Sequence, residues 1–401
     1  MAAGACAWHR TSITYRSERC LAVWAPHIAC EACLSVCPRD SLRLGDRRVT
    51  ADQRCVGCGR CAVVCPTGAI EASGYRPDIR DDDTAEAISV ECRRVAVAAL
   101  PATAVRVPCL GGLAPDDLLE LRLAAGTRPI HLIDRGWCAS CPAGGTPHPA
   151  RTALQRVAVL FEEMGRPDLA PTLVIRTSGG RRDPARSDGM DDVAAPARRA
   201  LLRSLRGSAT APARPDDAPM PPLSNGLPIE PIARFRAASA LTRIADRFDG
   251  PVASSSFYPS LDVDERCCNH QVCVAVCPTG ALAAGSDVTT VSLTFDPVRC
   301  IACGACVRHC PEQAVALAPA GPPPASPDRR RVLRRHPLRA CDGCGRPFAE
   351  AGSETLCFFC RKTRAFAQAA AFRFAGAVPP PVPISPPHPH AATRDQDPPR
   401  A

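Results

Sequence analysis

Hydrophobic and polar positions between residues 85 and 177 predict short strands that alternate with helices. Apolar runs suited to buried strands occupy residues 95–100, 103–107, 130–133 and 172–175. Apolar residues spaced three and four apart predict helices at 115–121 and 152–164. This alternation is typical of an α/β unit, so we expect a small α/β middle domain over 85–177.

Other segments lack such a pattern or carry a single helix. Residues 178–228 are rich in Pro, Arg, Gly and Asp, which predicts a linker with one helix at 195–205. Residues 74–84, with three consecutive aspartates, read as a solvated connector, whereas 229–248 predict a helix. Residues 376–401 hold too many prolines and too few apolar side chains to fold, so we expect a disordered tail.

Composition narrows the class of protein. The chain has 401 residues and 25 cysteines, and no run of 18 apolar residues that could span a membrane. Residues 1–19 show neither an apolar signal core nor a twin-arginine motif, so we expect a cytoplasmic protein without disulfides. The formal net charge of +9 treats cysteines as neutral. Fully metallated thiolates would shift it to about −3, so nucleic acid is not an expected partner.

The cysteines follow metal-ligand spacings. The run C-x2-C-x2-C-x3-C-P occurs at Cys55, Cys58, Cys61 and Cys65 and again at Cys300, Cys303, Cys306 and Cys310. A degraded copy precedes each run and ends at Cys37-Pro38 or Cys277-Pro278. Closely spaced thiolates approach a cubane cluster from several directions, and the fourth cysteine ligates the other cluster. The sequence therefore predicts two modules with two [4Fe-4S] clusters each.

These runs resemble the bacterial two-cluster ferredoxin family over roughly residues 18–75 and 262–318. The resemblance implies a module with βαββαβ order at 1–75 and a second at 229–320. With the middle domain, a C-terminal metal unit at 328–375 and the tail, the expected fold class is α+β and multidomain.

The first module departs from the family at His27, which stands where the upstream loop has its leading cysteine. Cys20 can supply the missing thiolate. We therefore expect a first site of Cys20, Cys30, Cys33 and Cys65, and a second site of Cys37, Cys55, Cys58 and Cys61. Ligation by His27 and a three-cysteine site are the alternatives.

The second module carries a parallel change, with His270 in the second position of its upstream loop. The adjacent Cys268 is the replacement that we expect. The third site is then Cys267, Cys268, Cys273 and Cys310, and the fourth site is Cys277, Cys300, Cys303 and Cys306.

The middle domain holds a looser set, the middle site: Cys92, Cys109, Cys138 and Cys141. Its sequence weakly resembles the iron–sulfur delta subunit of methyl-viologen-reducing hydrogenases, which implies a further cluster that passes electrons to a partner oxidoreductase. The pattern departs in the last loop, where Cys138 and Cys141 form C-x2-C. A redox dithiol or a structural thiol set is the alternative, favoured if these cysteines are far apart.

The C-terminal site comprises two C-x2-C turns, Cys341/Cys344 and Cys357/Cys360. Four thiolates on two tight turns complete a tetrahedron, as in zinc ribbons. Zinc is expected here, with rubredoxin-type iron as the alternative. The neighbouring arginines at 329–339 read as a solvated segment.

No phosphate loop, nucleophile elbow or Rossmann fingerprint is present, and His9, His131 and His148 read as ordinary surface or core histidines. We expect an electron-transfer iron–sulfur protein, a subunit or accessory of a larger oxidoreductase, whose partners are redox proteins. A redox-sensing binding or assembly factor, whose zinc ribbon docks a client enzyme or nucleic acid, is the competing class. A reductase acting through Cys138 and Cys141 is the third.

Overall fold

The computed structural model describes residues 13–45, 48–75, 79, 85–96, 99–101, 103–176, 228–251, 256–318, 320–321, 330–350 and 354–374. The predicted linker, its helix at 195–205 and the predicted tail lie outside these residues, apart from Pro228. The chain divides into two compact units, Met1–His336 and Pro337–Ala401. Each unit is described by itself.

The middle domain is built on a parallel four-stranded sheet with the order β6-β5-β7-β8. Its strands are β5 (Ile88–Cys92), β6 (Val105–Val107), β7 (Ile130–Asp134) and β8 (Thr172–Ile175). The predicted strands at 103–107, 130–133 and 172–175 are thus confirmed. The expected strand at 95–100 is wrong, because the described residues of that run form turns and the buried strand β5 precedes them.

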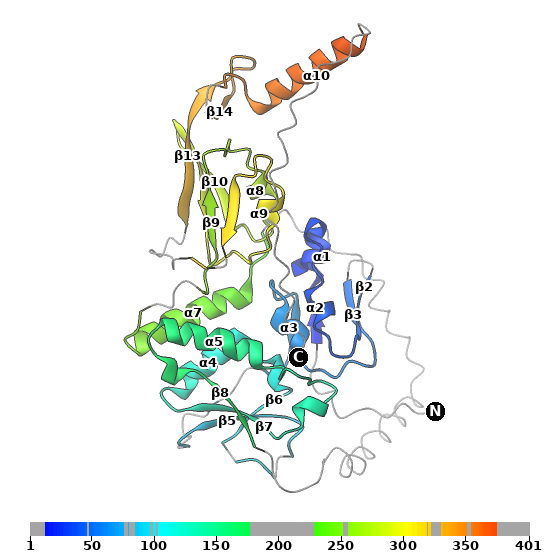
Figure 1. Ribbon diagram of the computed structural model, residues 1–401, viewed down its shortest axis with the longest axis vertical. Helices are drawn as coiled ribbons and strands as arrows, with labels where there is room; N and C mark the ends of the chain where they lie inside the picture. The colour runs from blue at the N-terminus through cyan, green and yellow to red at the C-terminus, as the bar shows by residue number, and fades with distance from the viewer. Residues whose placement is uncertain are drawn as a thin grey trace, which may run out of the picture. The chain divides into compact units, whose positions relative to one another are not determined.

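Helices α4 (Pro115–Ala125), α5 (Arg151–Glu163) and α7 (Ile232–Arg247) pack with this sheet (Figure 1). Proline at the first position of α4 and the Asp117 carboxylate, which accepts the Ala114 N–H at 3.0 Å, fix the start of that helix. Fully buried Leu118, Leu132 and Phe161 lie in the common core. The α/β prediction for the middle domain is therefore confirmed in its helices and in three of its strands.

Helix α7 contacts both the middle domain and the second module. Its buried Leu241 and Ile244 lie in the core of the middle domain, although its position in the sequence assigns it to the second module. Nearer its start, Arg234 donates to the carbonyl oxygens of Phe257 at 2.9 Å and Val298 at 3.1 Å, which belong to the second module. The helix therefore fastens the second module to the middle domain.

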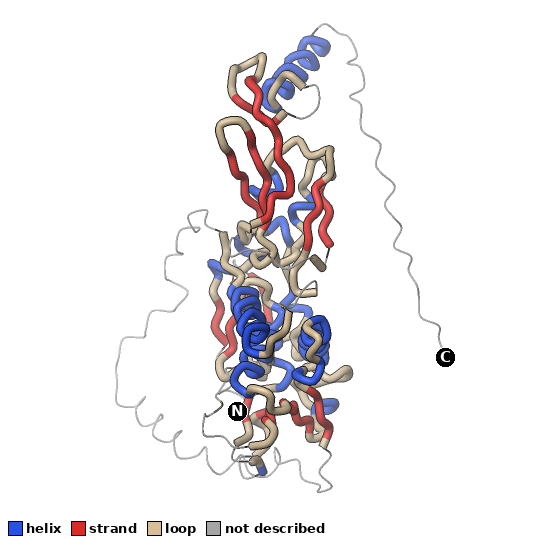
Figure 2. Tube along the Cα trace, turned by 90° about the vertical axis from the view of Figure 1, so that its left-hand side faces the viewer, coloured by secondary structure: helices blue, strands red, loops and turns tan. Residues whose placement is uncertain are grey.

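The first module orders its elements as strand, helices, hairpin, helix and strand. Figure 2 distinguishes the helices and strands of the described residues by colour. The outer strands β1 (Ile13–Tyr15) and β4 (Ile70–Ala72) pair antiparallel, as do β2 (Leu42–Gly45) and β3 (Arg48–Ala51). Short helices α1 (Leu21–Trp24), α2 (Ala32–Ser35) and α3 (Arg60–Val64) carry or flank the cysteines. Two 3-10 turns, η1 (Ser17–Arg19) and η2 (Pro26–Ile28), flank α1.

The second module repeats this order. Strands β9 (Ser260–Val263) and β12 (Val315–Ala318) pair antiparallel, and β10 (Leu282–Ser286) pairs with β11 (Thr290–Phe295). Its helices are α8 (Val272–Ala275) and α9 (Ala305–Arg308). A mixed architecture of helix and strand is thus established for the described residues.

Strand β13 (Arg331–Ala340) runs from the first unit into the second. Within the second unit its residues Leu338–Ala340 pair antiparallel with β14 (Pro347–Ala349), and α10 (Phe358–Phe374) follows.

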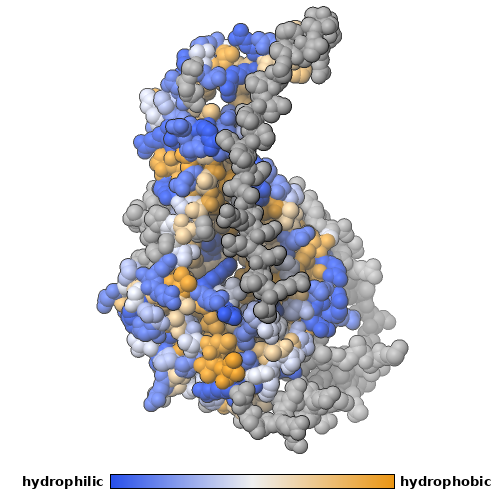
Figure 3. Space-filling view, viewed as in Figure 1, coloured by the Kyte–Doolittle hydropathy of each residue, from blue (hydrophilic) through white to orange (hydrophobic). Residues whose placement is uncertain are grey.

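In the described part of the chain, no helix combines the length and the hydrophobicity that a membrane crossing requires. On the face drawn in Figure 3, hydrophobic residues gather in separate patches among hydrophilic ones.

Candidate metal centres

The first site comes together as the sequence predicts. Sulfur-bearing side chains of all four of its cysteines line one hollow, with an apolar wall from residues such as Leu21, Val49 and Ile70. Cys20 is buried and directly precedes α1, so this short helix delivers the upstream thiol to the site. Burial, followed by neighbouring Cys65 and Cys20, raises the pKa of Cys33 to about 11. An iron–sulfur cluster bound in this apolar hollow would compensate the negative charge of the four thiolates.

His27 lies apart from that hollow. It sits in η2, where its Nε2 lies 3.4 Å from the carbonyl oxygen of Val276 and its ring packs edge-on against His309, with ring centres 5.2 Å apart. Val276 and His309 belong to the second module. The structure therefore favours Cys20 over His27 as the fourth ligand of the first site.

The second site lies in a separate hollow lined by all four of its cysteines. Gly59 begins α3 in the left-handed conformation, with φ of 72°, and a Cβ there would lie 2.6 Å from the ring of Tyr75. Burial, and then the thiols of Cys58 and Cys55, raises the pKa of Cys61 to about 12. The hollow again holds four thiols that a metal cluster could satisfy.

The fourth site repeats this arrangement, because its four cysteines line one hollow against Leu282 and Phe295. Gly304 takes the place of Gly59 at the start of α9, with φ of 70°. Burial, followed by Cys300, Cys277 and Cys303, raises the pKa of Cys306 to about 12. This hollow therefore repeats the four-cysteine arrangement of the second site.

The third site is less regular. Burial, followed by the nearby Cys267 and Cys310, raises the pKa of Cys273 to about 11. Cys268 lies with His270 and Glu312, and ligand atoms of these three side chains all lie within 4.8 Å of one another. The Nε2 atom of His270 is 3.0 Å from a Glu312 carboxylate oxygen. That contact engages one of the two imidazole nitrogens, and Cys268 stays the replacement ligand that the sequence predicts.

Backbone N–H groups point at several of these sulfur atoms. The residue four positions after a Cys-Pro cysteine donates to its Sγ in three cases: Ser41 to Cys37 at 3.4 Å, Ala69 to Cys65 at 3.2 Å and Ala314 to Cys310 at 3.3 Å. Burial opposes ionisation of Cys37, but hydrogen bonds from Ser41 outweigh it and lower its pKa. Such donors stabilise thiolates and tune cluster potentials.

The middle site lies at the carboxyl edge of the parallel sheet, where ligands of open α/β sheets bind. Cys92 ends β5, Cys109 follows β6, and Cys138 and Cys141 follow β7. The thiols of Cys58, Cys92 and Cys141 raise the pKa of Cys109 to about 12, after the larger effect of burial. The four cysteines therefore converge, which favours a cluster over separate thiols.

Two polar residues join this site that the sequence interpretation did not assign to it. The Asp134 carboxylate accepts N–H groups from Gly136 at 2.8 Å and Trp137 at 3.2 Å, which folds the loop that carries Cys138. His148 lies beside it, with Nε2 3.8 Å from Asp134 Oδ2. Carboxylate, thiol and imidazole atoms of Asp134, Cys138 and His148 all lie within 4.8 Å of one another. The sequence signal that could have identified Asp134 is its position at the end of a buried strand.

Tyr75 is a third residue that the sequence did not single out, since it falls in the predicted connector. Its side chain is buried, and its hydroxyl donates to the carbonyl oxygen of Cys58 at 2.7 Å. A Cβ at Gly112 would collide with this hydroxyl and with the same carbonyl. Tyr75 therefore anchors the second site to the middle domain.

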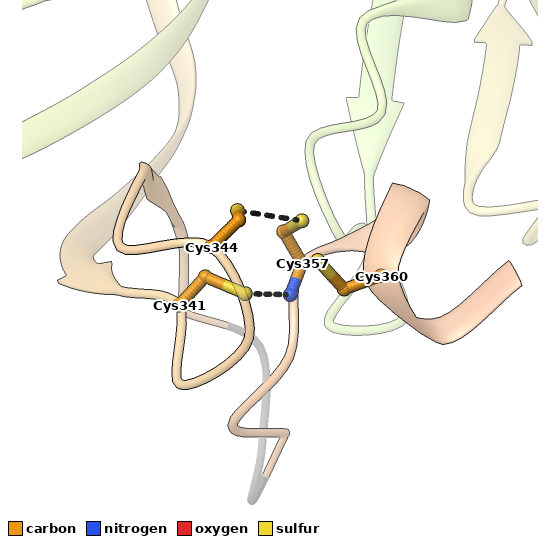
Figure 4. Close-up of side chains that lie close together, drawn as sticks. All are labelled: Cys341, Cys344, Cys357 and Cys360. Carbon is orange, nitrogen blue, oxygen red and sulfur yellow. Dashed lines mark hydrogen bonds between the residues drawn. The ribbon is translucent and has the colours of Figure 1, made fainter. Parts of the chain in front are cut away.

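The C-terminal site brings its four thiols together (Figure 4). All four Sγ atoms lie within 4.8 Å of one another, and those of Cys344 and Cys357 are 3.8 Å apart. A tetrahedron with metal–sulfur bonds of about 2.3 Å has edges of about 3.8 Å, so the spacing fits one ion. Backbone N–H groups, first that of Cys357 and then that of Gly343, lower the pKa of Cys341 to about 6. The site favours a thiolate-bound metal.

Two segments match known domain families. Residues 25–76 match the LdpA Fe-S cluster-binding domain, and residues 293–316 match a 4Fe-4S binding domain. The first match begins after Cys20, so the thiol that completes the first site lies outside the matched segment.

Curated relatives share short stretches with the chain. Hydrogenase-4 component A of Escherichia coli is 50% identical over 46 residues, which cover 11% of this chain and 22% of that protein. The polyferredoxin-like subunit of the aliphatic sulfonate oxidoreductase of Pyrococcus furiosus is 39% identical over 66 residues, covering 16% and 36%. An uncharacterized ferredoxin of Methanocaldococcus jannaschii is 46% identical over 39 residues, covering 10% and 26%. The chain thus spans about a fifth to a third of each relative's length.

Together, the domain matches and the relatives define a multi-cluster, ferredoxin-like iron–sulfur protein. The domain matched at residues 293–316 is of the 4Fe-4S kind.

Proposed function

We propose that this protein carries electrons within a cytoplasmic oxidoreductase complex, as a subunit or accessory with four [4Fe-4S] clusters. The observation that carries the proposal is the convergence of full cysteine sets: three separate hollows are each lined by four predicted ligands. When bound, the clusters supply one-electron redox chemistry. The chain's own groups hold them, bury them and donate N–H groups to the sulfur atoms, which sets their potentials.

The relatives support membership of a complex. One relative is a hydrogenase component and another is the polyferredoxin-like subunit of an oxidoreductase. Because this chain shares only part of each, its own donor and acceptor are proposed as redox proteins and are not named.

We propose a further cluster in the middle site and a zinc ion in the C-terminal site. Cys109 lies near Cys58, Cys92 and Cys141, which supports the first assignment. Four thiols within 4.8 Å on two short turns support the second, since zinc would hold this small unit folded without redox chemistry.

The competing classes have less support. Arg331 donates to Ser260 Oγ at 2.7 Å and Arg339 pairs with Glu350 at 3.8 Å, so these arginines are engaged within the chain rather than arranged for phosphates. Burial, followed by the Asp134 carboxylate, raises the pKa of Cys138. A reactive thiolate requires a lowered pKa, which opposes a reductase acting through this thiol.

The test is anaerobic purification followed by reduction with dithionite and transfer to oxidised cytochrome c as a one-electron acceptor. We expect about four electrons per chain from four cubanes. A reconstituted protein that binds its iron but gives up no electrons would contradict the proposal. Salt-sensitive DNA binding by the same holoprotein, lost on replacing Arg334 and Arg335, would favour the regulatory class instead.

A further inference from the structure

The first module contacts the second module at a junction made by His27. This residue lies between Cys20 and Cys30 of the first site, in η2. Its imidazole meets Val276 and His309, which directly precede Cys277 and Cys310. Those two cysteines belong to the fourth and third sites. The first site therefore faces both sites of the second module across one histidine.

The first module contacts the middle domain at a second junction, around Cys58. The Tyr75 hydroxyl donates to the Cys58 carbonyl oxygen, and a side chain at Gly112 would collide with both of these groups. Arg60, next to Cys61 on α3, donates to the carbonyl oxygen of Gly144 at 3.3 Å. The pKa of Cys109 is raised first by burial and then by Cys58, ahead of Cys92 in its own site. The second site therefore lies directly beside the middle site.

Within the first module the two sites are themselves adjacent. Cys33, Cys37, Cys61 and Cys65 pack around one small core with Leu42 and Ile70. The pKa of Cys61, a ligand of the second site, is raised in part by Cys33 of the first site. The adjacent first and second sites therefore connect the His27 junction to the Cys58 junction.

We propose that electrons pass between the second module and the middle site through the first module, a path that differs from the order of these parts along the chain. The proposal rests on the proposed function. Each transfer moves one electron, oxidising the site that releases it and reducing the site that receives it. A one-electron donor protein and an acceptor oxidoreductase subunit would serve the two ends. Because electron tunnelling weakens steeply with distance, adjacent sites form the favoured route.

A direct route along α7 is the alternative, since Arg234 lies beside Cys300 while the rest of the helix packs in the middle domain. Helix α7 carries no cysteine. The two routes predict different neighbours for the middle site.

The experiment measures spin relaxation of the middle-site EPR signal in reduced, anaerobic holoprotein. Cys61→Ser, which removes a ligand of the second site, is expected to abolish the relaxation enhancement of that signal. Cys306→Ser, which removes the equivalent ligand of the fourth site, is expected to leave it unchanged. The reverse pattern would establish the route along α7 and overturn the proposal.

His27→Ala tests the other junction with all cysteines in place. It is expected to slow the redistribution of electrons between the modules after photoreduction, without loss of iron. His131→Ala is the matched control, because its ring bonds Thr172 inside the middle sheet at 2.9 Å. Equal redistribution rates in His27→Ala and wild type would overturn this junction.

Iron content and dithionite reduction, measured first, separate the two failures. Clusters that bind but cannot be reduced would contradict the proposed function. A middle site without iron would instead overturn the proposed order together with the middle cluster, and would leave the proposed electron transfer by the two modules standing.

Discussion

The two iron–sulfur modules share one frame and differ in how they complete it. Each carries the same full motif, the same left-handed glycine before its last helix, and the same N–H donation to the final cysteine, from Ala69 or Ala314. Each also has histidine where the upstream loop should have cysteine. In the first module the expected replacement is Cys20, ten residues before Cys30, whereas in the second it is Cys268, next to Cys267.

The comparison shows that the two histidines at these cysteine positions make different contacts. His27 contacts the other module, and His270 bonds Glu312 on its own module. In the first module, the short helix α1 directly follows Cys20, and the Cys20 side chain lines the hollow. In the second, no such helix separates Cys268 from its neighbour, so the third site is the less regular of the two.

The largest expected effect concerns total metal. If both modules hold two cubanes, the anaerobic protein should contain about 16 iron atoms, or about 18 with a two-iron cluster in the middle site, and about one zinc. Iron, sulfide and zinc analysis of reconstituted protein checks this. A content near about 8 iron would mean that only one cubane per module assembles.

The next effect separates the modules by their replaced ligands. Cys20→Ala should convert one cubane to a three-iron cluster or remove it, a loss of about one to four iron atoms, visible by EPR. Cys6→Ala is the control, because Cys6 has no partner spacing and should change nothing. Unchanged iron and EPR in Cys20→Ala would return the ligand role to His27.

A parallel pair of variants tests the second module. Cys268→Ala should produce a similar loss from the third site, while His270→Ala should retain the iron because Cys268, and not His270, is the ligand that we expect there. EPR of both variants, with iron analysis, compares them directly. Loss of iron in His270→Ala alone would assign the imidazole as the ligand.

The smallest effect tests how the second module is held by α7. Arg236 on this helix pairs with Asp116 at 2.8 Å and Asp117 at 3.2 Å. Burial, and then Asp117, raises the pKa of Asp116 to about 6, while Arg236 opposes this rise. Because that pKa lies above the ordinary value, the contribution of this carboxyl to stability is full at low pH and is lost as pH rises through about 6.

Replacing the arginine removes the compensating charge. Arg236→Gln should therefore lower the free energy of unfolding by about 2 kcal/mol at about pH 7.5 and by less at about pH 5, measured by anaerobic denaturation. Arg243→Gln, which breaks the more exposed pair with Glu120, should change it by under about 0.5 kcal/mol. Equal losses at both pH values would show that Asp116 does not titrate in this range.

In the hollows of the second and fourth sites, three cysteines come from one short motif and lie near one another for that reason, whereas the fourth comes from the other run, as the ferredoxin resemblance implies. The sequence also predicted α4, α5 and β8 closely, since their apolar periodicity is strong. Tyr75, Asp134 and His148 were not assigned to sites, because their roles depend on contacts between segments distant in the sequence. The strand at 95–100 failed for a related reason: an apolar run does not reveal whether a buried sheet position is available.

Helix α7 also bears on how the chain can fold during synthesis. Residues 176–231 separate it from β8, yet Ala240, Leu241 and Ile244 fill the core formed by α4 and α5. A nascent chain that has released the middle domain from the ribosome would still expose the apolar face that α7 covers. Exposed faces of this kind favour aggregation or chaperone binding. The middle domain therefore stays incomplete until the first part of the second module has been translated.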